Sequence, residues 1–513
     1  MRKFTQSLAL AALLLSTSAY AQNVAPAVTV SAKAAKVPWL YEGSDVPVDD
    51  TWTFGVLPNG LRYAVKKNDV PAGQVSIRVR IDAGALHENN DEQGFAHLIE
   101  HLSFRGSTFV PDGEAKRIWQ RFGVTFGSDS NAQTTPTQTV YKLDLPNATP
   151  EKLDESVKII SGMIRNPRIS PSALNAERAI VLAELRENSG AQMVYSDALR
   201  QHAFQGQRLA NRSTIGTPET LQAADALRLS AFHDRWYRPE NAVVVMAGDI
   251  EPTQLANLVQ KYFNDWKGKG ARAPEPAFGD PTPQGTPTRV LIEPTLPTIV
   301  SIAYLRPWRK VDDTIAYNEQ LLIDALALQI INRRLEVQAR SGGNYLFAEI
   351  AQEDISRTAD ATLVSVTPVG DKWEAATRDV RAIIADAIAT PPSVADIERE
   401  KTLFGNALRT MLDSYPFEAA AKQADDIVNA VDIRETVAAP KTVVQVYEGM
   451  KDKFTPQRLL ASTQKLFMAD ATRLMLSSPA PIADADNRAL AALNAVVSAN
   501  TTARLSENTL GFA

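Results

Sequence analysis

The sequence predicts an α+β protein built from two structurally related domains that a proline-rich linker joins. Segments with the two-residue alternation of half-buried strands are interleaved with segments that have the 3.6-residue periodicity of amphipathic helices. Residues 271–288 are rich in proline and show neither pattern, which is typical of a linker. After this stretch the order of strands and helices starts again, and the echo indicates a structural duplication.

The N-terminus has the three parts of a secretory signal peptide. Basic residues at positions 2 and 3 precede an apolar run over residues 8–15, and the segment ends in Ala19-Tyr20-Ala21, a typical cleavage site. The alternative, a membrane anchor, needs about twenty consecutive apolar residues, which neither this run nor any later one provides. We therefore expect cleavage near Ala21, a periplasmic or secreted protein, and no membrane span after signal removal.

Composition excludes several classes of site. The chain has 513 residues, enough for more than one domain with a large core. Without Arg2 and Lys3 the 54 basic residues fall to 52, against 59 acidic ones, so the mature net charge of −7 gives no support for nucleic-acid binding. The sequence contains no cysteine, which excludes disulfides, thiolate metal ligands and cysteine nucleophiles. Any zinc site must use histidine and carboxylate ligands.

The first domain is expected to span residues 48–270, after the signal peptide (1–21) and a lead-in (22–47). Alternation is strictest in the strand at residues 75–81, whose serine and arginine side is expected to face solvent or a cavity. The longest expected helix, residues 171–204, consists of good helix formers with few helix breakers. The expected strands are residues 53–57, 61–65, 75–81, 139–145 and 242–246, and the expected helices are residues 94–102, 113–122, 150–163, 171–204 and 221–236.

The second domain is expected to span residues 289–480. Residues 481–513 are rich in alanine, asparagine and aspartate, and we expect them to form a tail or connector. The expected strands are residues 289–292, 298–305 and 362–368, and the expected helices are residues 314–340, 373–389 and 394–412.

The most informative stretch is the H-x-x-E-H motif formed by His97, Glu100 and His101. Residues four apart lie one turn above each other on one face of a helix, so the two histidines can bind one metal ion. This arrangement suits zinc, and Glu100 projects beside the same face, where it can address a water that the metal activates. The whole chain has five histidines, so an accidental pairing in an ordinary amphipathic helix is the weaker interpretation.

A catalytic zinc site needs a third protein ligand. The other histidines, at positions 87, 202 and 233, have ordinary polar neighbours and are expected to be surface or structural residues. Glu177 and Glu184 are better candidates because they are two helical turns apart on one face that apolar residues border. A solvated acidic stripe that also includes Glu187 is an equally good interpretation of this pattern alone.

Several stretches of the first half together resemble the pitrilysin and insulin-degrading-enzyme family of zinc peptidases, which includes the mitochondrial processing peptidase. The resemblance implies two α/β-sandwich domains, each a mixed sheet with helices on one face, of which the second is catalytically silent. The sequence has no histidine after His233, in agreement with a silent second domain. The matching stretches are Leu57-Pro58-Asn59-Gly60-Leu61, residues 94–101, Arg105-Gly106-Ser107, Asn131-Ala132, Thr139-Val140-Tyr141, Glu177-Arg178 with Glu184, and residues 236–241 followed by Gly248-Asp249.

The resemblance also implies the chemistry of the motif. It implies one zinc ion per chain, bound by His97, His101 and Glu184. It implies that Glu177 supports the catalytic site without binding metal. Glu100 is then the general base that takes a proton from the attacking water and hands it to the leaving amine.

Substrate contacts follow from the same resemblance. The segment of Asn131 and Ala132 corresponds to a sheet edge to which an extended peptide adds as a strand. Arg340 and Tyr345 in the second domain match an arginine and a tyrosine that assist substrate binding. Chambers in this family use four such domains, so we expect a second two-domain half as partner, which is a homodimer mate, a sister subunit or a missing C-terminal half.

The sequence therefore predicts an exported zinc endopeptidase that hydrolyses peptides or unfolded segments. A non-catalytic core or assembly subunit of the same fold is the alternative from another class, although the intact H-x-x-E-H motif argues against it. A peptidase dedicated to one precursor is a further alternative that the sequence does not separate from a general peptide scavenger.

Overall fold

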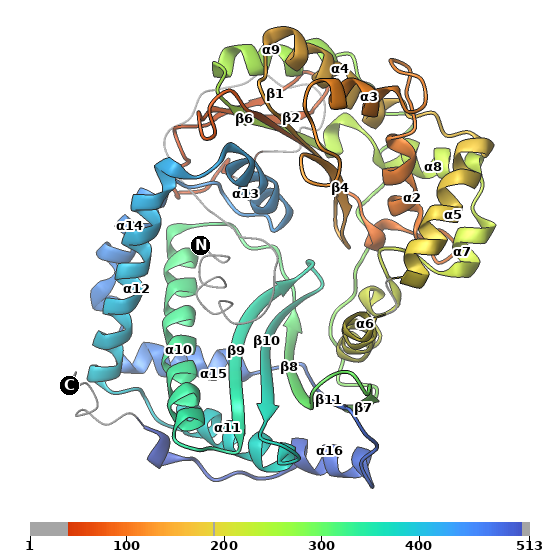
Figure 1. The fold of residues 1–513 in the computed structure, drawn as a ribbon. Helices are drawn as coiled ribbons and strands as arrows, with labels where there is room; N and C mark the ends of the chain where they lie inside the picture. The colour runs from red at the N-terminus through yellow and green to blue at the C-terminus, as the bar shows by residue number, and fades with distance from the viewer. Residues whose placement is uncertain (1–38, 40, 188–189, 505–513) are drawn as a thin grey trace.

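The computed structural model describes residues 39, 41–187 and 190–504. The expected signal peptide, residues 1–21, lies outside this part of the chain. Each half of the chain forms a mixed β-sheet, and Figure 1 shows the two sheets at opposite ends of the molecule with helices around and between them. The predicted α+β class with two related halves is confirmed.

The first sheet has six strands, which are β1 (Thr53–Val56), β2 (Arg62–Lys67), β3 (Val75–Ile81), β4 (Ser130–Thr134), β5 (Thr139–Leu145) and β6 (Ala242–Gly248). Their order is β1-β2-β6-β3-β5-β4. β2 and β6 are parallel, and the other neighbours are antiparallel. The strand β4 therefore lies at one edge of the sheet.

The second sheet repeats this topology. Its strands are β7 (Thr288–Ile292), β8 (Ile299–Pro307), β9 (Tyr345–Ile355), β10 (Ala359–Pro368) and β11 (Ala471–Ser478). Their order is β7-β11-β8-β10-β9, with one parallel pair, β7 and β11, followed by antiparallel pairs. This is the β2-β6-β3-β5-β4 order of the first sheet, so the predicted duplication is confirmed.

The helices of the first half are α2 (Phe95–Ser103), α3 (Glu114–Arg121), α4 (Pro150–Arg165), α5 (Pro171–Glu187), α6 (Ala191–Ala203), α7 (Pro218–Ala223), α8 (Ala226–Trp236) and α9 (Pro252–Phe263). Those of the second half are α10 (Ile315–Arg340), α11 (Trp373–Ala389), α12 (Val394–Ser414), α13 (Ala420–Asp432), α14 (Pro440–Gly449), α15 (Pro456–Phe467) and α16 (Ala485–Asn494). Short 3-10 helices are η1 (Ala85–His87), η2 (Arg208–Asn211), η3 (Pro239–Asn241), η4 (Tyr415–Phe417), η5 (Lys451–Lys453) and η6 (Thr501–Ala503).

Some elements differ from the sequence-based expectation. The single helix expected over residues 171–204 forms α5 and α6, and Gly190 is the extended N-cap of α6. The helix expected over residues 221–236 is also divided, because the side chain of Asp225 accepts the backbone N–H of Arg228 and starts α8 as a new helix. Within the expected tail, α16 packs on the second sheet and buries Ala489.

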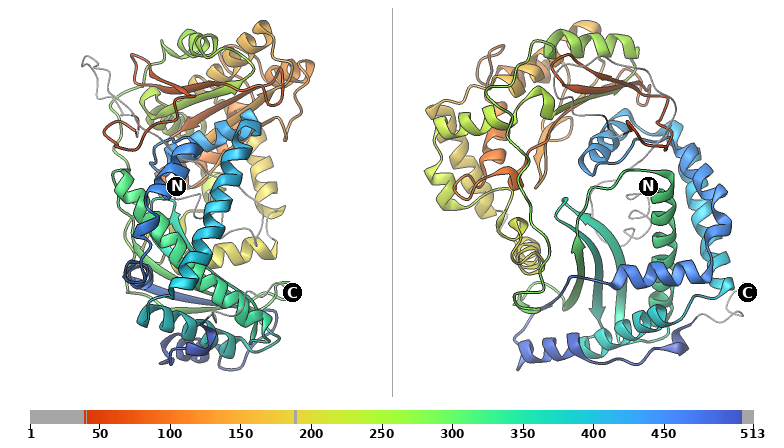
Figure 2. Two further views of the ribbon diagram at one scale, coloured as in Figure 1. Left: turned by 90° about the vertical axis from the view of Figure 1, so that its left-hand side faces the viewer. Right: turned by 180° about the vertical axis from the view of Figure 1, so that it is seen from behind.

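The two faces of the first sheet are covered by different halves of the chain. Helices α2, α4, α8 and α9 pack on one face, and α13 of the second half packs on the other (Figures 1 and 2). The arginines of β3 are therefore buried under α13, where Arg78 pairs with Asp425 (2.9 Å) and Arg80 pairs with Asp432 (3.0 Å). The expectation that this side of β3 faces solvent or a cavity is wrong, because its cover comes from a distant part of the chain.

The second sheet receives a helix from the first half in return. Helix α6 packs against β7 and β11. The Nε2–H of His202 donates to the carbonyl oxygen of Leu474 in β11 (3.0 Å), and the hydroxyl of Tyr195 bonds to the hydroxyl of Ser301 in β8 (2.6 Å). Each half thus contributes a helix that buries part of the sheet of the other half.

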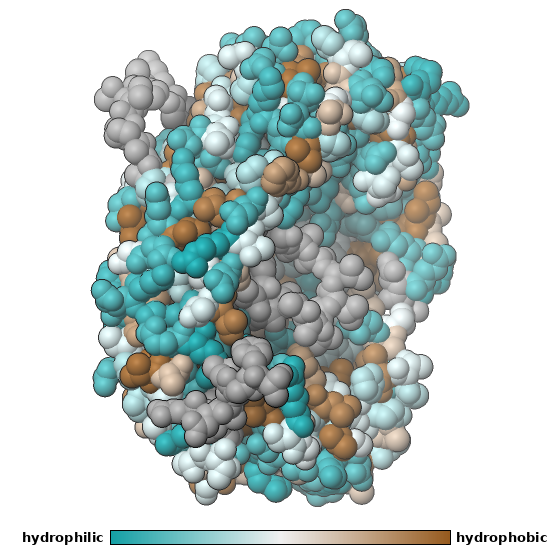
Figure 3. Space-filling view, turned by 60° about the vertical axis from the view of Figure 1, so that its left-hand side comes forward, coloured by the Kyte–Doolittle hydropathy of each residue, from teal (hydrophilic) through white to brown (hydrophobic). Residues whose placement is uncertain are grey.

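The described part of the chain contains no helix that could cross a membrane. Its helices lack the combination of length and apolar composition that crossing a bilayer requires. The face in Figure 3 is mainly hydrophilic, and the apolar residues on it are scattered.

Because two histidines are buried, we expect the free energy of unfolding to fall in acid. Burial lowers the pKa of His202 to about 4 and the pKa of His87 to about 3, so both rings are neutral in the folded protein at pH 7. In the unfolded chain each ring binds a proton below about pH 6.5. Their contribution to stability is therefore complete above that pH and is lost as the pH falls toward the folded-state values.

Urea unfolding of the wild type and His202→Gln, between about pH 7.5 and 4.5, tests this expectation. The glutamine amide can still donate to the carbonyl of Leu474, but it does not titrate. The free energy of unfolding of the variant should fall less steeply, by up to about 1.4 kcal/mol per pH unit. Parallel curves for the two proteins would contradict a neutral buried ring.

Candidate metal centre

Helix α2 carries the H-x-x-E-H motif, and a buried carboxylate fixes its N-terminus. Glu88 accepts the backbone N–H groups of Gly94 (3.0 Å) and Ala96 (2.9 Å), which lie where a helix leaves its donors unpaired. Gly94 has a left-handed conformation (φ 90°), and a side chain there would collide with the carbonyl of Ile215. These contacts hold the start of α2 in one position.

The burial of α2 turns the two histidines toward a neighbouring helix. Leu98 and Leu102 are fully buried in the core of the first half. His97 and His101 occupy the other face, with their rings 4.7 Å apart between centroids and at 82° to each other. Their side chains are 13% and 21% exposed, so they lie at the border between core and solvent.

Glu184 on α5 faces both histidines. Its Oε2 lies 3.8 Å from Nε2 of His97 and 3.6 Å from Nε2 of His101. The three donor atoms lie within 4.8 Å of one another, and no other such group of histidine, cysteine, aspartate or glutamate occurs among the residues that the structure describes. The sequence-predicted metal ligands are therefore brought together.

The donor atoms fit a zinc ion. Their separations exceed hydrogen-bond distance, so the three groups face a shared space without bonding each other. Tetrahedral zinc ligands at about 2.0–2.2 Å from the ion lie about 3.3–3.6 Å apart, close to the separations found here. Two imidazoles and a carboxylate are also the donor types of catalytic zinc sites with three protein ligands.

Glu177 has a different position from Glu184. Its Oε2 lies 2.9 Å from Nδ1 of His101, and its Oε1 accepts a hydrogen bond from Nε of Arg105. Burial by itself raises the pKa of Glu177, but the bonds from His101 and Arg105 outweigh this effect and hold the pKa below its usual value. With Nδ1–H donated to Glu177, the Nε2 lone pair of His101 is directed at the shared space.

Glu100 lies at the wall of a cavity of about 610 Å³ that His101 and Glu177 also line. Burial raises the pKa of Glu100, and a hydrogen bond from the hydroxyl of Thr134 to its Oε2 (2.7 Å) opposes this rise. A carboxyl group with a raised pKa, next to a metal site, has the properties of a general base and acid.

The edge strand β4 borders the same cavity. Asn131 lines it, and Ala132 follows on the strand, which pairs with β5 on one side only. The apolar part of the wall consists of Phe104, Phe126 and Ile180. The cavity therefore connects Glu100 and the candidate ligand His101 to an open strand edge.

Arg340 and Tyr345 do not lie at this site. Arg340 is 77% exposed at the end of α10 and pairs with Glu336. Tyr345 is buried in the core of the second half, where its hydroxyl donates to the carbonyl of Leu335 (3.0 Å). Figure 1 shows this end of α10 far from α2. Their assignment as substrate-binding residues has no support from this geometry, because it depended on a match along the chain.

Three residues of the site environment were not singled out from the sequence. Thr134 and Glu88 give no local signal, since their partners lie on other elements. Arg105 belongs to a matching stretch, but only the fold brings its guanidinium to Glu177.

A duplicated α/β fold, in which an H-x-x-E-H helix faces a carboxylate on a second helix, defines the class of inverzincin-type metallopeptidases. The comparison with known families agrees with this class. Residues 63–217 match the insulinase family, peptidase family M16, and residues 223–404 match the peptidase M16 inactive domain. The chain belongs to the insulinase-like peptidase family M16.

Relatives of the chain include proteins named as zinc proteases. The probable zinc protease PqqL of Haemophilus influenzae is 32% identical over 222 residues, which is 43% of this chain and 24% of that protein. The protein of the same name from Escherichia coli is 28% identical over 300 residues, 58% of this chain and 32% of that protein. The matches thus span about a quarter to a third of the length of these relatives.

Solved structures share the fold. The first half of the periplasmic protease PqqL from Escherichia coli has a TM-score of 0.80 at 21% sequence identity and covers 89% of this chain and 99% of that one. In the full PqqL structure the TM-score is 0.81 and the match covers 51% of that chain. At this identity the likeness establishes the fold alone.

Replacing Glu177 by glutamine is expected to weaken zinc binding about 10- to 100-fold, because His101 loses the carboxylate that fixes its ring and tautomer. Competition with a fluorescent zinc chelator measures this affinity. Glu187→Gln is the matched control, since Glu187 is exposed at the end of the same helix. Equal losses in both variants, or none in Glu177→Gln, would contradict the orienting role.

Proposed function

We propose that this chain is the catalytic half of an exported zinc endopeptidase that hydrolyses peptides or unfolded protein segments. The observation that carries the proposal is the convergence of two imidazole nitrogens and one carboxylate on a shared space, beside the buried carboxyl group of Glu100. Membership of peptidase family M16 and similarity to probable zinc proteases support it.

The side chains divide the work between binding and proton transfer. His97, His101 and Glu184 would hold the zinc ion, which when bound supplies polarisation of a peptide carbonyl and lowers the pKa of water to about 7. Glu100 takes a proton from the attacking water and gives it to the leaving amine. Thr134 orients the carboxylate of Glu100 for both transfers.

The open edge of β4 supports an extended peptide as substrate. A peptide that pairs with β4 would run along the cavity that Asn131 and Glu100 line. Recognition through backbone hydrogen bonds favours unfolded segments and tolerates many side chains. A protein of this fold, the ferredoxin protease FusC, has been solved in complex with Arabidopsis ferredoxin (TM-score 0.71), in line with a polypeptide substrate.

Two further parts of the proposal concern location and assembly. The signal-peptide pattern of residues 1–21 supports export, and the solved PqqL relative is described as periplasmic. The chain matches 51% of full-length PqqL, which supports cooperation with a second two-domain unit, whether a second copy, a sister subunit or a covalent second half. A non-catalytic subunit of the same fold is the alternative function, and one relative, 30% identical over 213 residues, is named as a subunit of a complex, cytochrome b-c1 complex subunit 1 of Bos taurus. The assembled His97, His101 and Glu184 favour catalysis over that alternative.

Metal analysis combined with cleavage of an unstructured peptide tests the proposal. Wild type and Glu100→Gln should each bind about one zinc ion, because Glu100 is not among the three ligands. Only the wild type should cleave the peptide, since the glutamine cannot accept a proton. Equal activity of both proteins would remove Glu100 from this role, and zinc binding without any cleavage by the wild type would favour the non-catalytic alternative or an absent partner half.

The third ligand is tested by Glu184→Ala. We expect this variant to lose zinc at a concentration that saturates the wild type, because two histidines alone leave the ion without its charged ligand. Inductively coupled plasma analysis after gel filtration measures the metal content. Full zinc occupancy in Glu184→Ala would mean that another acidic residue is the third ligand.

A further inference from the structure

The hairpin between β9 and β10 extends from the second half and contacts the first half at its tip. At its tip, Ser356 and Arg357 are both left-handed (φ 50° and 56°). The side chain of Arg357 is 2% exposed, and its Nη2 lies 3.3 Å from Oδ1 of Asp82 and 3.4 Å from the carbonyl oxygen of Thr137. Its Nη1 donates to Glu275 (2.6 Å). A strained, buried hairpin tip in this position needs these partners to persist.

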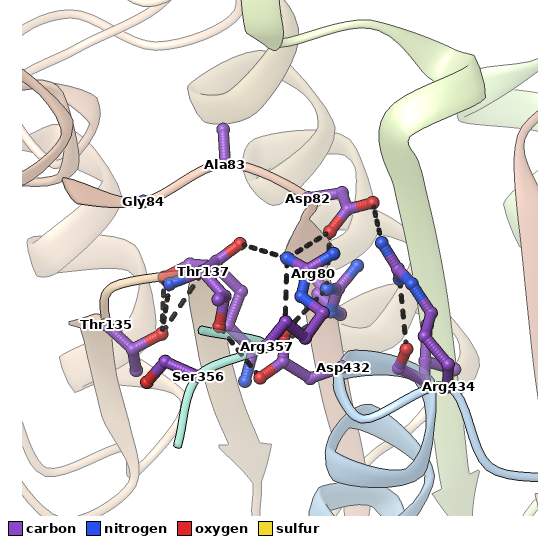
Figure 4. A network of polar contacts seen from close by, with 12 residues as sticks. Arg80, Asp82, Ala83, Gly84, Thr135, Thr137, Ser356, Arg357, Asp432 and Arg434 are labelled. Carbon is purple, nitrogen blue, oxygen red and sulfur yellow. Dashed lines mark hydrogen bonds and ion pairs between the residues drawn. The ribbon is translucent and has the colours of Figure 1, made fainter. Parts of the chain in front are cut away.

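Helix α13 contacts the same place with its last residue. Asp432 accepts the hydroxyl of Thr137 at Oδ2 (2.9 Å) and Nη2 of Arg80 at Oδ1 (3.0 Å). Arg434, just beyond α13, donates to Oδ2 of Asp82 (2.8 Å). Figure 4 shows Asp432 and Arg357 beside Thr137, with Arg434 farther away at Asp82, so two elements of the second half meet at one turn of the first.

That turn joins the edge strand β4 to β5. It covers residues 135–138, and it packs on the segment before α2, where Ala85 and Leu86 donate to the carbonyls of Thr135 (3.1 Å) and Pro136 (2.8 Å). The contact is close, because a Cβ on Gly84 would lie 2.1 Å from the carbonyl oxygen of Thr135. Thr134, the residue before the turn, donates to Glu100. The position of the turn thus sets the position of Thr134.

We propose that Arg357 is a positioning residue for the reaction, through which the second half holds the β4–β5 turn, the bond from Thr134 to Glu100 and the open edge of β4. The inference rests on the proposed peptidase function. It gives the second half, which contributes no metal ligand among the described residues, a direct effect on the catalytic carboxylate.

The charge balance indicates that the fold survives without Arg357. Arg80 and Arg434 remain paired with Asp82 and Asp432, so both buried carboxylates keep a cation. Glu275, the other partner of Arg357, is 52% exposed and can be solvated. Loss of Arg357 therefore releases the turn without leaving a buried charge unpaired.

Hydrogen exchange and kinetics of Arg357→Met test the proposal, because methionine keeps the packing volume and removes the hydrogen bonds. Amides of the β4–β5 turn and of residues 85–86 should exchange about ten-fold faster, with zinc content unchanged. On an unstructured peptide kcat should fall about 10- to 100-fold, as expected for a displaced catalytic carboxylate. Arg357→Lys should restore part of the protection from exchange and part of kcat.

Two further variants separate positioning from general stability. Arg309→Met, which removes an exposed ion pair between the second half and the linker, should change neither exchange at the turn nor kcat. Thr134→Val should lower kcat, and adding Arg357→Met to it should cause little further loss, since both act on Glu100 through one bond.

The outcomes are distinct. The positioning role is wrong if the turn of Arg357→Met exchanges at the wild-type rate. It is also wrong if the loss of kcat in the double variant is the product of the losses in Thr134→Val and Arg357→Met. Thr137→Val, which removes only the hydroxyl contact to Asp432, gives a milder test of the same turn if Arg357→Met does not fold. If the wild type cleaves no peptide, that result concerns the proposed function or its partner half, while exchange at the turn still decides whether Arg357 holds the turn.

Discussion

A sheet with apolar residues on both faces must be shielded from water on both. Each half of this chain, however, supplies a full helical layer for only one face of its own sheet. The other face of the first sheet is covered by α13, and on the second sheet α6 covers the part that β7 and β11 form. The buried arginines of β3 add a condition, because their guanidinium groups need the aspartates of α13. The halves consequently depend on each other, although the topology of each is complete.

The candidate metal centre lies within the first half, but its surroundings do not. Its donor atoms come from α2 and α5, two helices of the first half that pack directly together. The turn that follows the bordering strand β4 is contacted by residues more than 200 positions away, since Asp432 and Arg357 bond to Thr137. In the proposed peptidase, the second half thus acts on the reaction by holding the turn beside β4, although it contributes no metal ligand among the described residues.

Sequence patterns worked where the physical cause is local. The spacing of His97 and His101 sets their common face, and the alternation in β3 and the proline-rich linker are equally local features. The start of α6 after the extended Gly190 and the start of α8 after the N-cap Asp225 lie inside stretches with helical periodicity, and periodicity alone misses them. Strand β9 was also missed, since its acidic residues weaken the apolar alternation.

The sequence by itself determined the kind of chemistry, since two histidines and an acid on one helical face, in a chain without cysteine, restrict the metal and its ligands. Only the tertiary structure decided which glutamate of α5 faces both histidines and which one orients the His101 ring. Two turns of a helix place both glutamates on one face, and only the packing of α5 against α2 distinguishes them. It also decided that Arg340 and Tyr345 lie away from the site, that Thr134 bonds to Glu100, and that Arg357 contacts the turn after Thr134. Such contacts join residues far apart in the chain, and no local pattern encodes them.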